Sequence, residues 1–136
     1  MRLFIYCSDP REEADLETKI SQQLLVPNEK IMRLANCGYP MVLAHPICFR
    51  DGAGWLLSQI DFMINNFHPE QAIFVGHDCG WYETVPSLAE TSLFEKKRDI
   101  ANIHKMLLRR HPYQAFVSLF DVSQQGGQVQ FEHFAA

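Results

Sequence analysis

The segment formed by residues 72–81 constrains the fold of this chain more than any other. It begins with four apolar residues, Ala-Ile-Phe-Val, and Gly76 follows them. A short apolar run bounded by glycine is typical of a strand that is buried on both faces of a sheet. His77, Asp78 and Cys79 come next, so an imidazole, a carboxylate and a thiol stand where the strand ends. Open α/β folds bind their ligands at this edge of the sheet.

A second segment of the same form lies at the start of the chain. The apolar run of residues 3–6 is followed by Cys7 and then by Ser-Asp-Pro-Arg. If the two strands are neighbours in a parallel sheet, we expect Cys7, His77 and Cys79 to converge on one ion. Two thiolates and an imidazole are ligands that suit zinc. They fill three of its four tetrahedral positions and leave one open, as a catalytic zinc site requires.

The repeating apolar patterns predict how the rest of the chain is built. Strands are expected at residues 1–6, 30–35, 72–75, 115–122 and 128–134, with a short extended piece at 41–44. Helices are expected from Asp9, as the first residue of a capping box, from Asp51 as N-cap, and from Ser92 through a second capping box with Glu95. A Gly-Gly turn between the last two strands indicates a hairpin. The fold class is therefore a three-layer α/β sandwich, with a mostly parallel four-stranded sheet and an antiparallel C-terminal edge strand.

Length and charge limit the class of protein. The chain has 136 residues, which predicts one domain covering residues 1–136. The formal net charge is −4, and the basic run Lys96-Lys97-Arg98 is expected to be a solvated helix face, so neither nucleic acid nor membrane is an expected partner. No secretory signal or membrane-spanning run is recognisable, which favours a cytoplasmic protein whose four cysteines are thiols or metal ligands.

Two motifs of the chain are similar to those of a known family. Residues 7–11, Cys-Ser-Asp-Pro-Arg, resemble the Cys-x-Asp-x-Arg motif of the β-class carbonic anhydrases. Residues 75–80, Val-Gly-His-Asp-Cys-Gly, resemble the Val-Gly-His-x-x-Cys-Gly motif of that family, with one residue fewer. Residues 33–38 are similar to its Arg-Asn-Ala-Gly segment, and residues 115–129 to its last pair of strands.

This resemblance implies a function and a set of site residues. It implies zinc-dependent hydration of carbon dioxide to bicarbonate by a zinc-bound hydroxide, with Cys7, His77 and Cys79 as the metal ligands. It further implies that Arg11 pairs with Asp9 and holds this carboxylate away from zinc, as the acceptor for the metal-bound water. An arginine keeps a neighbouring carboxylate ionised, which is consistent with that role.

The resemblance also implies a homodimer or a dimer of dimers with active sites near the subunit boundary. The chain has more large aromatic residues in or beside loops than a small core needs, and some of them are expected to be buried at an interface. These residues are Trp55, Trp81, Tyr82 and Phe94.

Other interpretations of the same residues stay open. The chain could be a catalytically inactive relative that binds a small anion or a protein partner, or a structural domain rich in thiols. A His-x-Cys spacing brings both side chains to one side only where the backbone is extended. The alternative pair His45 and Cys48 has the His-x-x-Cys spacing instead, and Cys37 is a further, weaker candidate.

Overall fold

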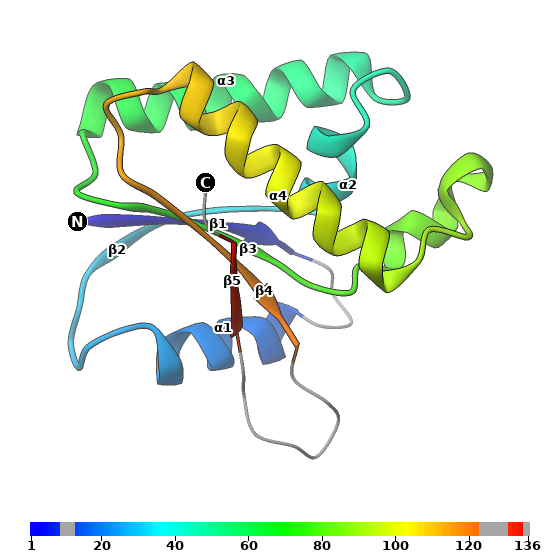
Figure 1. Ribbon diagram of the computed structural model, residues 1–136. Helices are drawn as coiled ribbons and strands as arrows, with labels where there is room; N and C mark the ends of the chain where they lie inside the picture. Colours follow the sequence, from blue (N-terminus) through cyan, green and yellow to red (C-terminus); the bar gives the residue numbers. More distant parts are fainter. Residues whose placement is uncertain (9–12, 123–130, 135–136) are drawn as a thin grey trace.

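The computed structural model describes residues 1–8, 13–122 and 131–134, and five strands of this part form one sheet (Figure 1). Their order across the sheet is β2-β1-β3-β4-β5. The strands are β1 (Arg2–Cys7), β2 (Ile31–Asn36), β3 (Ala72–Gly76), β4 (Phe116–Asp121) and β5 (Phe131–Phe134). The first four pair in parallel, and β5 pairs antiparallel to β4 at the edge. The predicted mostly parallel sheet with an antiparallel edge strand is confirmed, whereas the Gly-Gly turn lies outside the described residues.

Helices cover both faces of the sheet. The helix α1 (Glu13–Gln23) lies on one face, and α2 (Tyr39–Ala44), α3 (Arg50–Phe67) and α4 (Leu93–Arg110) lie on the other (Figure 1). The predicted three-layer arrangement is therefore confirmed. None of the helices in the described part of the chain combines the length and the apolar character needed to cross a bilayer.

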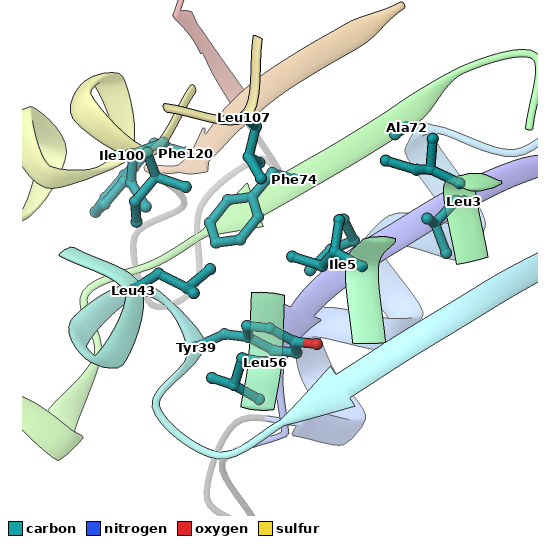
Figure 2. Close-up of a cluster of buried hydrophobic side chains, with 13 residues drawn as sticks. Leu3, Ile5, Tyr39, Leu43, Leu56, Ala72, Phe74, Ile100, Leu107 and Phe120 are labelled. Atoms are coloured by element: carbon teal, nitrogen blue, oxygen red, sulfur yellow. The ribbon is translucent and has the colours of Figure 1, made fainter. Parts of the chain in front are cut away.

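Two apolar cores form because side chains of the central strands alternate between the faces. Leu3 and Ile5 of β1 and Phe74 of β3 belong to the larger core beneath α2, α3 and α4 (Figure 2). Phe4 and Val75 point the other way and belong to the smaller core, which is closed by α1. Since β1 and β3 are buried on both faces, their carboxyl ends are held at fixed positions in the middle of the sheet.

The helix α4 packs directly over the end of β3. A Cβ atom at Gly76 would collide with the side chain of Ile100, so this residue of α4 packs directly against the glycine. The N-terminus of this helix is fixed by the predicted capping box, in which Ser92 Oγ accepts from the Glu95 amide at 3.1 Å. The first turns of α4 are thereby placed beside the residues that follow Gly76.

The prediction of an extended piece at residues 41–44 is wrong, because the chain forms α2 there. Gly38 precedes this helix in the left-handed conformation, with a φ of 68°, and Pro40 occupies its first turn, where a missing amide hydrogen does no harm. Tyr39 and Leu43 are buried against the larger core. A short apolar run fits either a strand or a helix by pattern alone.

Two smaller expectations were also wrong. Asp51 is not the N-cap of α3, because Phe49 holds that position. Asp51 lies in the first turn, where the interaction of a carboxylate with the helix dipole is still favourable. Lys96 of the basic run is buried, although it was expected to be solvated. Of the aromatic residues expected in or beside loops, Tyr82 is buried, whereas Trp55 lies in α3 and is exposed. The interface stays a prediction.

Candidate metal centre

The pairing of β1 with β3 brings together the residues that follow the two strands. Tyr6 pairs with Val75, so Cys7 lies beside the end of β3. The ligand atoms of Cys7, His77 and Cys79 all lie within 4.8 Å of one another, and in the described part of the chain no other group of three such residues forms a possible metal site. The predicted convergence of the two strand ends is therefore found in the structure.

The separation of the two sulfur atoms fits a tetrahedral zinc ion. Cys7 Sγ and Cys79 Sγ are 3.8 Å apart. Two sulfurs that each bind a tetrahedral zinc at about 2.3 Å lie about 3.8 Å from each other. Because His77 adds a nitrogen donor within the same group, the donor set is the two thiols and one imidazole that zinc sites use. The residues present thus fit a metal ion.

The backbone at Cys79 is extended, which is consistent with a His-x-Cys pair that faces one side. Cys79 has φ −77° and ψ 119°, which is strand-like geometry. Side chains two residues apart on such a backbone point the same way, and the residue between them points the opposite way. His77 and Cys79 are buried, whereas the Asp78 side chain is 65% exposed. The shortened spacing is therefore compatible with two ligands on one side.

The three side chains lie beneath an apolar cover. Cys7 is 1% exposed, Cys79 0% and His77 4%. Met41 of α2 packs in one buried cluster with the two cysteines, together with Tyr82 and Leu88 of the segment between β3 and α4. Such a cover excludes bulk water and lowers the local dielectric, which strengthens every charge interaction inside the site.

The surroundings of Cys7 favour its thiolate. Contact with the Cys79 thiol lowers the pKa of Cys7 to about 5, with further help from His77 and the Gly38 amide, while burial acts in the opposite direction. The Gly38 nitrogen donates to Cys7 Sγ at 3.2 Å. Because metals bind cysteine as the thiolate, Cys7 is prepared to bind one at neutral pH.

We predict that the metal-free protein has one thiolate that forms near pH 5. The ordinary pKa of cysteine is 9.0 here, so between about pH 5 and 9 the folded state binds fewer protons at Cys7 than the unfolded state. Its contribution to stability is complete above pH 9 and is lost as the pH falls through 5. The ultraviolet absorbance of thiolates measures the transition in a Cys37→Ser/Cys48→Ser background, and adding Cys7→Ala should remove it. A first transition above pH 8 would contradict the prediction.

The sequence did not point to a polar network that borders this site. Lys96 Nζ donates to Asp78 Oδ1 at 2.7 Å and to the Cys79 carbonyl at 3.2 Å. The Tyr82 hydroxyl donates a hydrogen bond to Asp99 at 2.6 Å. Burial is the main cause that raises the pKa of Tyr82 well above its usual range, and the Asp99 carboxylate is the second cause. The sequence contained one indication that Lys96 is buried, because this lysine lies on the same helical stripe as the buried isoleucines and leucine of α4.

The chain was compared with known proteins. No family model, curated protein or solved structure matches it. The relation to the β-class carbonic anhydrases therefore stays a prediction that depends on the motifs.

The remaining candidate residues divide into two groups. Asp9 and Arg11, to which the resemblance gives a role beside the metal, lie outside the described residues. His45 and Cys48, the alternative pair, belong to no group of three possible metal ligands in the described part of the chain. His45 Nε2 lies 2.9 Å from Asp99 Oδ2, and the Cys48 side chain is exposed. Cys37 is exposed as well and contacts Ser8.

Proposed function

We propose that the chain is a zinc-dependent enzyme that hydrates carbon dioxide to bicarbonate, with Cys7, His77 and Cys79 as the zinc ligands. The observation that supports this most is the 3.8 Å separation of the two cysteine sulfurs, with His77 in the same buried group. This arrangement leaves one of four tetrahedral positions for a reactant. The reaction class, hydration of carbon dioxide, is inferred from the resemblance of residues 7–11 and 75–80 to motifs of the β-class carbonic anhydrases.

The chemistry that a bound zinc ion supplies is Lewis-acid activation of water near neutral pH. The chain's own residues set the conditions for it. Cys7 and Cys79 provide two negative charges that balance the charge of the ion, and the Gly38 amide holds Cys7 through its hydrogen bond. In this proposal Asp9 would accept a hydrogen bond from the reacting water, and Arg11 would keep Asp9 ionised for that role. Water and carbon dioxide then give bicarbonate and one proton.

Two thiolates donate more charge to the ion than a set of imidazoles would. We therefore expect hydration to be slow at pH 6 and to increase toward mildly alkaline pH. The test is the zinc content of the purified chain together with its hydration rate across this range, before and after removal of metal by a chelator. We expect about one zinc per chain, loss of activity on chelation and recovery when zinc is added back. A chain that binds no added zinc, or is fully active at pH 6, would refute the proposal.

A second candidate is a structural zinc centre without turnover. The near-complete burial of the ligands beneath Met41, Tyr82 and Leu88 favours it, because a catalytic site must admit its substrate. The same experiment separates the two functions. One zinc per chain with no measurable hydration at any pH, and a large loss of thermal stability on chelation, would support the structural centre.

A further inference from the structure

A lysine on α4 contacts the segment that carries two of the three proposed zinc ligands. Lys96 is 8% exposed, although lysine is among the residues least often buried. Its ammonium donates to Asp78 at 2.7 Å and to the Cys79 carbonyl at 3.2 Å, and lies 5.0 Å from the centre of the Tyr82 ring. All of these partners lie within residues 78–82, at or directly after the ligand pair.

These contacts involve Asp78, the residue that lies between the two proposed ligands. His77 and Cys79 face the same side only while the chain around Asp78 is extended. Lys96 binds the side chain of Asp78, which points away from the ligands, and also the carbonyl of Cys79. One bond holds the side chain of Asp78 and the other holds the backbone of Cys79, so Lys96 restrains both residues that follow His77.

Stability alone is a weak reason for placing a lysine here. Lys96 lies one position beyond the first turn of α4, close to the helix end where a positive charge is disfavoured. Burying its ammonium adds a cost that an ion pair with the mostly exposed Asp78 offsets poorly. Lys97 next to it has a conventional role, since it forms an ion pair with Glu132 at 3.0 Å and is partly exposed.

We propose that Lys96 is a positioning residue of the metal centre, which holds the His77–Cys79 segment extended so that its imidazole and thiol face Cys7. It takes the place of the longer loop that a His-x-x-Cys spacing would provide. The inference rests on the proposed function only in that these three residues bind a metal ion. It concerns metal affinity and ligand geometry rather than the reaction.

The test uses Zn²⁺ and Co²⁺ as probes with Lys96→Met, which keeps the length of the side chain and removes its charge and donors. We expect about 10- to 100-fold weaker zinc binding by competition with a chromophoric chelator, the range typical for loss of an outer-shell partner. The thiolate-to-metal and d–d absorption of bound cobalt should shift, because the ligand geometry changes. Lys97→Met is the matched control, and its zinc affinity and cobalt spectrum should equal those of the wild type.

Asp78→Ala provides a second variant should Lys96→Met fail to fold. It changes a largely exposed side chain and removes one of the two contacts, so its loss of zinc affinity should be smaller but measurable. Wild-type affinity and an unchanged cobalt spectrum in either folded variant would overturn the positioning role and leave the metal site intact. A wild-type chain that binds neither ion would overturn the proposed function and the positioning role together.

Discussion

Replacing Cys79 by serine is expected to abolish stable zinc binding and carbon dioxide hydration. A serine hydroxyl stays protonated at neutral pH and is a poor zinc ligand, so only Cys7 and His77 would remain. The loss of affinity should exceed the roughly 10- to 100-fold that follows removal of an outer-shell partner. Zinc content after dialysis, zinc competition titration and the hydration rate measure the effect.

The control for this variant is Cys48→Ser, because Cys48 is an exposed thiol outside the cluster. It should keep one zinc per chain and the wild-type rate. Circular dichroism must show that Cys79→Ser is folded, since a buried hydroxyl costs about 1–3 kcal/mol of stability where it lacks a partner. Wild-type zinc affinity in folded Cys79→Ser would exclude Cys79 as a ligand.

The largest effect on stability is expected from Phe74→Ala. Phe74 is 0% exposed in the centre of the larger core, where its ring meets that of Tyr39 edge-on at 6.3 Å between centroids (Figure 2). Truncation removes apolar contacts and leaves a cavity, which together cost about 3–5 kcal/mol for a buried phenylalanine. Urea unfolding of the metal-free protein measures this loss without a contribution from zinc.

Phe62→Ala is the matched control for the core variant. Phe62 lies on the outer side of α3 and is 58% exposed, so its truncation should change the free energy of unfolding by no more than about 0.5 kcal/mol. Equal effects of the two substitutions would contradict the assignment of Phe74 to the core.

The sheet was predictable because its strands carry strong local signals. Buried central strands such as β1 and β3 are short apolar runs that end at polar residues, and Ser92 and Glu95 begin α4 through a capping box that the structure confirms. Segment 41–44 was not predictable in the same way. Its helical form depends on the left-handed Gly38 and on packing beneath α3 and α4, which a run of four apolar residues does not encode.

The meeting of Cys7, His77 and Cys79 was predictable from the sequence, whereas the surroundings of this cluster were not. Parallel strands end at the same edge of a sheet, so the polar residues after β1 and β3 had to meet there. The role of Lys96 depends on which face α4 turns toward the loop after β3, and that follows from tertiary packing. Asp99 of α4 and His45, which directly follows α2, likewise come together although no sequence pattern relates them. The spatial roles of Asp9 and Arg11 stay predictions.

The two sulfurs of the site are 72 residues apart in the chain. During synthesis no such pair exists until β3 has left the ribosome and docked beside β1, which closes a long loop. Under the proposed function, ion uptake would therefore follow tertiary assembly, and a bound ion would shift the equilibrium toward the assembled chain by mass action. Loading with zinc would then report that the central strands have paired.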